Sequence, residues 1–270
     1  MKKVVVVIPV HKPALTQNEL ASLKQCYNIL GSHPIRIVAP EGMDMSVYQN
    51  AVPGCEVIFI SPEWLSGIQQ YNKLKISKYF YDLFKDYEYL LTYELDAWVF
   101  RDELLYWCDK GYDFIGAPWF EVSGKSHSNE FRGVGNSGFS LRSIKSCRRI
   151  LRKIEILKKI RILWYQSKLQ SIVRVEILFR RLSFLFSIKD IQAIERLIFD
   201  GWHPHEDDNW CIYVTAAFKD FELSNWEDAI KFSFEVNPDL LFRKNNLQLP
   251  FGCHAWEKYE VNFWLSQIHL

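Results

Sequence analysis

The sequence has no long apolar segment. None of its 270 residues belongs to an uncharged apolar run of about 18 residues, the length that a membrane-spanning helix requires. The apolar run at residues 4–8 follows two lysines and so resembles the start of a signal peptide. It is too short for one, and no small-residue cleavage site follows it. We therefore expect residues 4–10 to form a buried first strand.

Common nucleotide- and metal-binding patterns are also missing. No Gly-x-Gly-x-x-Gly follows the first expected strand, which excludes the dinucleotide-binding fingerprint, and no Walker A phosphate loop is present. The six cysteines are widely scattered and include no Cys-x-x-Cys pair. This spacing argues against a zinc site and against a disulfide framework. It favours reduced thiols in a cytosolic protein.

Aromatic residues, in contrast, are abundant. They make up 16% of the chain and hydrophobic residues 49%, which excludes a disordered protein. Ten tryptophans and thirteen tyrosines are more than a core of this size requires. They either surround the core or line a ligand groove. The length suits one domain, and neither an internal repeat nor a low-complexity linker divides it.

The net charge of +1 conceals a strongly basic segment. Residues 142–189 contain 14 Lys and Arg but only two acids, so the rest of the chain carries a net charge of −11. Apolar residues from Ile150 to Ile160 recur at helical spacing. A single helix over all of residues 142–189 would extend for about 70 Å, which is too long for this domain. We expect two helices with a break near residues 166–171. The segment is either a solvated face or a surface that docks on an anionic membrane or acceptor, and no nucleic-acid-binding motif accompanies it.

Alternating strand and helix patterns predict the fold. Short β-branched runs predict strands, and apolar residues at three- and four-residue spacing predict helices. Thr16 and Glu19 have the spacing of a capping box at the start of the first helix. The expected strands are residues 4–10, 35–39, 56–60, 89–91 and 139–141, and the expected helices are residues 16–30, 67–84 and 209–218. This order indicates a Rossmann-like α/β fold with a mostly parallel central sheet, helices on both faces, and ligands beyond the carboxyl ends of the strands.

Two acids stand where a buried strand leaves the sheet. Glu94 and Asp96 follow an apolar run, and alternate residues of an extended chain point to the same side. Their carboxylates can therefore converge on one hard cation such as Mg²⁺ or Mn²⁺. Such a cation would bridge a diphosphate and neutralise it as a leaving group. An Asp after a strand is also a common turn or cap residue, so that alternative stays open.

Three further segments have residues suited to a site. Residues 133–142 place three glycines within six positions, just before an expected strand. Asp207 lies among three consecutive acids at a helix start, which either favour the helix dipole or supply a base for an acceptor hydroxyl. His254 lies among aromatic residues and is either a packed side chain or an imidazole ligand of the metal site.

These four signals, in this order, resemble the GT-A glycosyltransferases. The resemblance is greatest to a largely uncharacterised family of bacterial glycosyltransferases that share Leu-Asp-Ala-Trp-Val-Phe-like and Gly-Asn-x-Gly-Phe-Ser-Leu-Arg-like segments. It covers residues 70–143 and 202–264, and the first strand fits the general fold. The basic segment matches nothing in that family and is expected to be a helical insertion.

The resemblance implies a role for each matching position. Asp96 and His254 would bind Mn²⁺ or Mg²⁺ together with Glu94. Asp207 would be the catalytic base of an inverting reaction, and Glu206 would orient the acceptor sugar. The nucleotide would contact Pro9, Val10, His11, Lys12 and Asp96, and the donor and acceptor sugars would lie beside Asn136, Ser137 and Gly138. The tryptophans that flank the motifs would stack on sugar faces, with packing as the alternative for each: Trp119, Trp202, Trp210 and Trp256.

The sequence therefore predicts a metal-dependent glycosyltransferase. It would use a UDP- or GDP-linked donor and a glycan or lipid-linked acceptor, in surface-polysaccharide biosynthesis, from the cytoplasm or the inner membrane face. Residues 1–270 would form one domain, with a nucleotide-binding half at 1–100 and an acceptor half at 101–270. One alternative is a nucleotidyltransferase, although residues 10–15 lack the Gly-rich basic loop usual there. The other is a non-catalytic carbohydrate-binding protein of the same fold.

Overall fold

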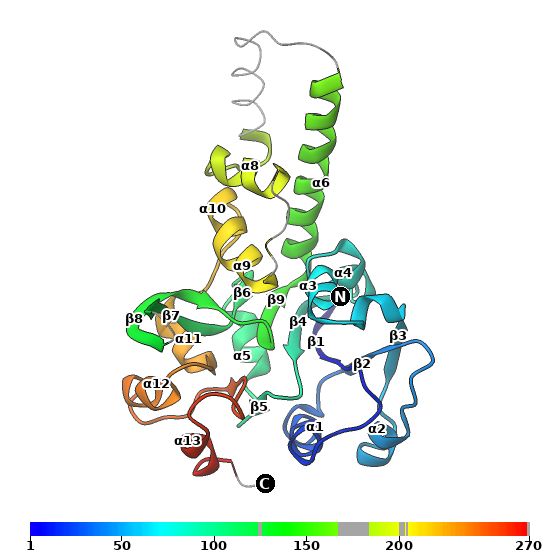
Figure 1. Ribbon diagram of the computed structural model, residues 1–270, viewed down its shortest axis with the longest axis vertical. Helices are drawn as coiled ribbons and strands as arrows, with labels where there is room; N and C mark the ends of the chain where they lie inside the picture. The colour runs from blue at the N-terminus through cyan, green and yellow to red at the C-terminus, as the bar shows by residue number, and fades with distance from the viewer. Residues whose placement is uncertain (124–125, 167–183, 200–202, 204, 269–270) are drawn as a thin grey trace.

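A six-stranded sheet forms the centre of the computed structural model, which describes residues 1–123, 126–166, 184–199, 203 and 205–268. Its strands are β1 (Lys2–Pro9), β2 (Ile35–Pro40), β3 (Val57–Ile60), β4 (Tyr87–Tyr93), β6 (Phe114–Ile115) and β9 (Phe139–Ser143). Their order is β3-β2-β1-β4-β9-β6 (Figure 1). The first four pair in parallel, and β9 is antiparallel to β4 and β6. The predicted mostly parallel α/β sheet is confirmed.

Helices cover both faces of this sheet. Successive side chains of a strand point to opposite faces, so Val5 and Val7 of β1 enter one apolar cluster while Val4 and Val6 enter another. Because both faces are buried there, β1 is apolar from Val4 onward, after the two lysines that begin it. The first cluster includes side chains of α3 (Ile68–Lys75), α4 (Lys78–Leu83), α6 (Ile144–Gln166) and α8 (Ile191–Phe199), and the second includes those of α1 (Gln17–Leu30), α2 (Ser46–Ala51) and α5 (Leu104–Asp109).

Local hydrogen bonds decide where the helices begin. Thr16 Oγ1 accepts from Glu19 N at 3.1 Å, and the Glu19 carboxylate accepts from Thr16 N at 2.8 Å, which confirms the capping box of α1. The single helix predicted at residues 67–84 is instead two helices, α3 and α4. Ser77 Oγ accepts from Phe80 N at 3.2 Å, so it caps a new helix.

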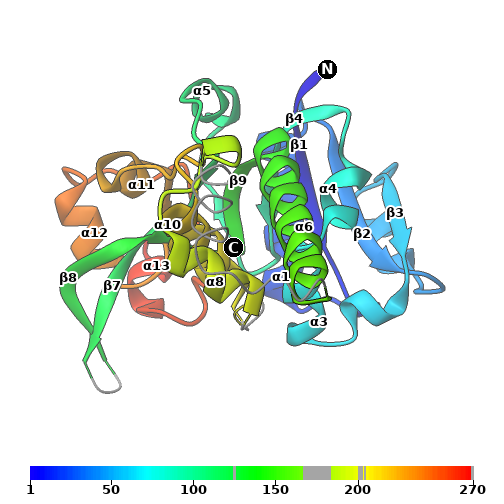
Figure 2. The ribbon, with the colours of Figure 1, turned by 90° about the horizontal axis from the view of Figure 1, so that it is seen from above.

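Shorter elements surround a third apolar cluster. β10 (Ser233–Phe234), β11 (Gly252–Cys253) and β5 (Trp98–Val99) form a small sheet, and β7 (Ala117–Ser123) and β8 (Ser126–Gly135) form a hairpin that projects on the side away from β3 (Figure 2). The α11 (Trp226–Phe232), α12 (Pro238–Lys244) and α13 (Val261–Leu265) helices also contribute to this cluster. The other short helical segments are η1 (Pro62–Leu65), α9 (Glu206–Asp208), η2 (Asn209–Val214) and α10 (Thr215–Ala217), and side chains of η1, η2 and α10 belong to the first cluster. The helix predicted at residues 209–218 thus begins earlier, at Glu206, and contains a π-helical turn, η2.

In the described part of the basic segment, several cationic side chains are buried or paired with acids and so are not free to bind an anionic partner. Arg142 is fully buried, which corrects the prediction that it belongs to a surface for anionic partners. On α6, Arg148 pairs with Asp82 at 2.6 Å and Lys153 pairs with Asp220 at 2.7 Å. Acids from other parts of the chain therefore neutralise much of one side of this helix.

The α6 and α8 helices project together away from the sheet (Figure 1). α6 ends at Gln166, and the break predicted near residues 166–171 falls mainly on residues 167–183, outside the described part of the chain. Among the described residues, no helix combines the length and apolar character needed to cross a membrane.

Candidate active site

A cavity opens at the carboxyl ends of β1 and β4. These strands are parallel neighbours, so the segments that follow them leave the sheet at the same edge. The cavity has a volume of about 460 Å³, and α1, α2 and the loop before α3 complete its wall. All five residues predicted to bind the nucleotide line it, namely Pro9, Val10, His11, Lys12 and Asp96. The structure brings them together, while nucleotide binding itself stays a prediction.

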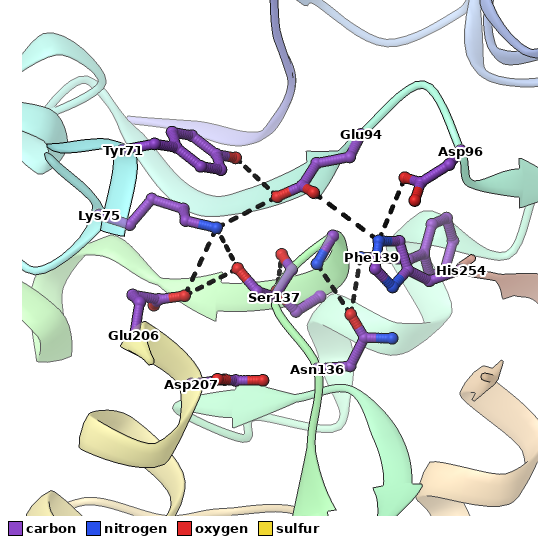
Figure 3. Close-up of polar contacts among 12 residues, drawn as sticks. Tyr71, Lys75, Glu94, Asp96, Asn136, Ser137, Phe139, Glu206, Asp207 and His254 are labelled. Atoms are coloured by element: carbon purple, nitrogen blue, oxygen red, sulfur yellow. Dashed lines mark hydrogen bonds and ion pairs between the residues drawn. The ribbon is translucent and has the colours of Figure 1, made fainter. Parts of the chain in front are cut away.

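Glu94, Asp96 and His254 form a cluster beside this cavity that could hold a metal ion, and we call it the metal-ligand cluster (Figure 3). Each offers one ligand atom, and these atoms lie within 4.8 Å of one another. Glu94 and Asp96 lie in the turn after β4, which a hydrogen bond from Ala97 N to Glu94 O closes at 2.9 Å. His254 follows β11, whose antiparallel pairing with β5 brings it to this turn. Its Nε2 lies 3.1 Å from Asp96 Oδ1 and 3.7 Å from Glu94 Oε2.

The surroundings of His254 suit a metal ligand. Its Nδ1 lies 3.0 Å from Oε1 of Glu235, a residue that the sequence analysis did not identify. Its Nε2 is buried and lies at ion-pair distance from Asp96, but has no hydrogen-bond partner among the described residues. A Cβ on Gly138 would lie 2.1 Å from this nitrogen, so only glycine leaves room for the ring. Two carboxylates and an imidazole of this kind fit Mn²⁺ or Mg²⁺.

The two oxygens of Glu94 have different surroundings. Oε1 accepts hydrogen bonds from Tyr71 Oη at 2.7 Å and from Lys75 Nζ at 3.1 Å, whereas Oε2 faces His254. Burial raises the pKa of Glu94, but Lys75 and His254 outweigh burial and hold that pKa well below its usual value. Burial likewise lowers the pKa of His254, but nearby carboxylates, Asp96 first among them, raise it well above its usual value. The carboxylates around His254 therefore favour the protonated form of its imidazole when no metal is bound.

A buried charge network adjoins the cluster. Arg142 of β9 and Glu206 of α9 are both fully buried, with Nη1 and Oε1 2.5 Å apart. Figure 3 shows Glu206 beside Lys75 and Ser137. Glu206 Oε2 also accepts from Ser137 Oγ at 2.9 Å and lies 3.7 Å from Lys75 Nζ. This corrects the prediction that Glu206 orients the acceptor sugar, because a carboxylate with no exposed atom and both oxygens already paired cannot contact one. It balances the buried charges of Arg142 and Lys75 instead.

Asn136 fixes the loop that connects β8 to β9. Its φ of 83° is left-handed, and its Oδ1 accepts hydrogen bonds from Gly138 N at 2.8 Å and Phe139 N at 3.3 Å. Gly138 O in turn accepts from Glu94 N at 2.8 Å, which ties the loop to the metal-ligand cluster. Asn136 Nδ2 is buried and has no hydrogen-bond partner among the described residues. The loop thus adjoins the metal-ligand cluster, and contacts between Asn136 and a sugar stay a prediction.

Asp207 differs from its neighbour Glu206. It is half-buried, and its Oδ1 accepts from Asp208 N at 3.1 Å. Burial, reinforced by the charges of Glu206 and Asp208, raises the pKa of Asp207 to about 6. A carboxyl group with a pKa near neutrality can exchange protons at physiological pH, as a general base must. Asp207 is therefore still a candidate base, and its role as the catalytic base stays a prediction.

One family model matches most of this chain. Residues 54–254 match the family described as "Protein of unknown function (DUF5672)". The chain belongs to this family. The matched span runs from before α3 to His254 and so contains the whole metal-ligand cluster, but not β1. No curated protein matches the chain in sequence.

Several solved glycosyltransferase structures resemble this DUF5672 member at low sequence identity. Galactosyltransferase LgtC, in complex with donor and acceptor sugar analogues, has a TM-score of 0.48 and 13% identity over 93% of this chain and 86% of its own. Mouse xyloside xylosyltransferase 1 has a TM-score of 0.47 and 12% identity over 94% of this chain and 97% of its own. Core-mannan synthase A from Aspergillus fumigatus, in an Mn/GDP form, has a TM-score of 0.41 and 9% identity. That match covers 54% of this chain and 60% of the length of core-mannan synthase A. Likenesses this distant do not assign an activity.

Two of the tryptophans predicted to bind sugars belong to the core of this DUF5672 chain. Trp210 and Trp256 are at most 1% exposed, so neither ring offers a face to a ligand, and the predicted stacking is wrong for both. Trp119 of β7 is half-buried and packs on Gly135, where a Cβ would lie 1.8 Å from its ring. It stays a candidate for sugar stacking. Trp202 lies outside the described residues.

Proposed function

We propose that the chain is a metal-dependent glycosyltransferase. It would transfer a sugar from a UDP- or GDP-linked donor to a carbohydrate or lipid-linked carbohydrate acceptor. The observation that carries this proposal is the cluster of Glu94, Asp96 and His254 beside a cavity that residues 9–12 also line. A cavity of about 460 Å³ has the size of a small-molecule site, and an adjacent divalent-cation site suits a ligand that carries a diphosphate.

The residues around the cavity would divide the work of donor binding. A divalent cation held by Glu94, Asp96 and His254 would neutralise the negative charge of the departing diphosphate. Asp96 has the most exposed side chain of the three, at 45%, and would therefore be the ligand most accessible to an entering donor. His11 and Lys12 would contact the base and ribose. The residues that line the cavity all precede position 100, which supports a nucleotide-binding half at residues 1–100 and an acceptor half at 101–270.

Asp207 would act on the acceptor. In an inverting reaction, its carboxylate would take the proton from the attacking hydroxyl group. A pKa of about 6 leaves most of this carboxylate ionised at neutral pH, yet makes it a better proton acceptor than an ordinary Asp. Because Arg142 and Ser137 occupy the oxygens of Glu206, Asp207 is the member of this pair that remains available for proton transfer.

A thermal-shift experiment with nucleotides and nucleotide sugars tests the proposal. UDP or GDP is expected to raise the melting temperature only when Mn²⁺ is present, because ligand binding to the folded state stabilises it. Asp96→Ala should abolish this shift and the transfer of sugar. The matched control is Asp86→Ala, which removes an exposed acid just before β4 and should change neither the thermal shift nor the transfer of sugar. Nucleotide binding that is indifferent to Mn²⁺, or full activity of Asp96→Ala, would refute the proposal.

The same proposal places the protein in the cytoplasm, at an anionic membrane face where a surface polysaccharide is assembled. On α6, the side chains of Lys145 and Arg152 are exposed and could contact anionic headgroups. Flotation with anionic liposomes tests this. Binding is expected at low salt and is expected to fall at high salt and in the double variant Lys145→Glu, Arg152→Glu. Absence of binding at low salt would remove the membrane from the proposal.

A further inference from the structure

Glu235 contacts His254 on the side of the ring that faces away from the metal-ligand cluster. β10 and β11 pair in parallel with Phe234 opposite Cys253, so the next residues along the two strands, Glu235 and His254, lie side by side. The backbone N–H of His254 donates to Phe234 O at 3.0 Å, which fixes this register. Glu235 Oε1 then lies 3.0 Å from His254 Nδ1, and both side chains are mostly buried, at 17% and 14% exposed.

This contact determines which imidazole nitrogen can bind a metal. An ionised carboxylate only accepts hydrogen bonds, so Nδ1 of His254 must carry the hydrogen of the N–H group that donates to Glu235. Nε2 is then the nitrogen whose lone pair can bind a cation, and it is the one that faces Asp96 and Glu94. Nε2 is also the buried atom that lacks a hydrogen-bond partner among the described residues.

The other two members of the cluster are held differently. Tyr71 and Lys75 hold Glu94 through Oε1, which leaves Oε2 turned towards His254. Asp96 is the more exposed acid. The cluster thus has two ligands that neighbouring side chains hold in place and one that is open to solvent. Protein metal sites are commonly built in this way, with outer groups that orient the ligands.

We propose that Glu235 is a positioning residue for divalent-cation binding at His254. Its carboxylate orients the ring, keeps the proton on Nδ1 and makes Nε2 a stronger donor to the metal. The inference rests on the proposed function, since it presupposes that the cluster of Glu94, Asp96 and His254 binds a metal. The competing explanation is that Glu235 only joins β10 to β11 through an ion pair, in which case its loss would lower stability without a specific effect on metal affinity.

Titration of the 270-residue chain with Mn²⁺, followed by electron paramagnetic resonance, tests this without relying on activity. Glu235→Ala is expected to weaken Mn²⁺ binding by roughly 10- to 100-fold, the range found when such outer partners are removed. Glu235→Gln keeps an acceptor for Nδ1–H but loses the charge. Its Mn²⁺ affinity should therefore lie between the affinities of Glu235→Ala and the unmodified chain. The control is Glu227→Gln, which removes an exposed acid at the start of α11 and should bind as the unmodified chain does.

A double-mutant comparison separates the two explanations. If Glu235 acts through His254, then Glu235→Ala should cause no further loss of Mn²⁺ affinity in a His254→Ala background. The inference would be overturned if Glu235→Ala bound Mn²⁺ with the same affinity as the unmodified chain. If Glu235→Ala does not fold, the same affinity for Glu235→Gln and the unmodified chain would overturn it. Failure of the unmodified chain to bind Mn²⁺ would instead overturn the proposed function, and the inference with it.

Discussion

Replacement of Asp207 by Asn removes a carboxylate that is unfavourable to ionise in its folded surroundings. The pKa of Asp207 is raised to about 6, whereas the pKa of Asp in an unfolded chain is about 3.9. The folded state therefore holds this proton more tightly than the unfolded state, so stability falls as pH rises from about 4 to about 6 and is constant above that. The difference in pKa corresponds to at most about 3 kcal/mol at pH 8 and to roughly half of that at pH 5.

Urea unfolding of the metal-free protein measures this effect. With EDTA present, Asp207→Asn is expected to be more stable than the unmodified chain by up to about 3 kcal/mol at pH 8, and by about half as much at pH 5. Asp86→Asn is the control, because Asp86 is exposed, and it should change stability at neither pH. A variant that gains nothing at pH 8, or that gains equally at the two pH values, would show that Asp207 is not a desolvated acid.

The same substitution has an opposite effect on activity. If Asp207 is the base, Asp207→Asn should lose nearly all sugar transfer although it is more stable. The rate for the unmodified chain should rise with pH through about 6, as the Asp207 carboxyl group loses its proton. Full activity of Asp207→Asn, measured as transfer from the donor that the thermal-shift screen identifies, would refute the role as base and leave the stability argument intact.

The structure makes three other predictions. Gly138→Ala should weaken Mn²⁺ binding by about tenfold in the same titration, because the added methyl group would lie 2.1 Å from His254 Nε2 and displace that ligand. Glu206→Ala should lower the free energy of unfolding by about 3–5 kcal/mol, because it leaves the guanidinium of Arg142 buried without its carboxylate; a second change, Arg142→Met, should restore part of this. Thr16→Ala should cost about 1 kcal/mol in urea unfolding through loss of the capping box, with Mn²⁺ affinity unchanged.

Local sequence patterns were sufficient for the central sheet, apart from the two-residue strand β6, and for the position of the two acids. An apolar β-branched run can be satisfied only by a strand buried on both faces, and β1 is such a strand. Thr16 and Glu19 cap α1 through bonds that span three residues, so their outcome does not depend on the rest of the fold. Periodicity was less reliable where a polar side chain competes with the helix backbone, as the start of a new helix after Ser77 shows.

The environment of each acid could not be read from its neighbours in sequence. Glu206 and Asp207 are adjacent and equally acidic, yet one is fully buried against Arg142 and the other has a pKa near neutrality. The difference arises from β9, which delivers a guanidinium to one carboxylate only. Trp210 gave a similar ambiguity, since an aromatic residue beside a motif can face either a ligand or the core.

The sequence by itself determined the parallel sheet, the strand-end acids Glu94 and Asp96 and a late histidine as their candidate partner, because strand periodicity and helix caps depend on nearby residues. Only the tertiary structure decided that His254 reaches those acids and that Glu235 holds it in place. Both facts depend on the pairing of β5, β10 and β11, which have two residues each. Strands so short carry almost no pattern of their own, and their register is set by packing between distant parts of the chain.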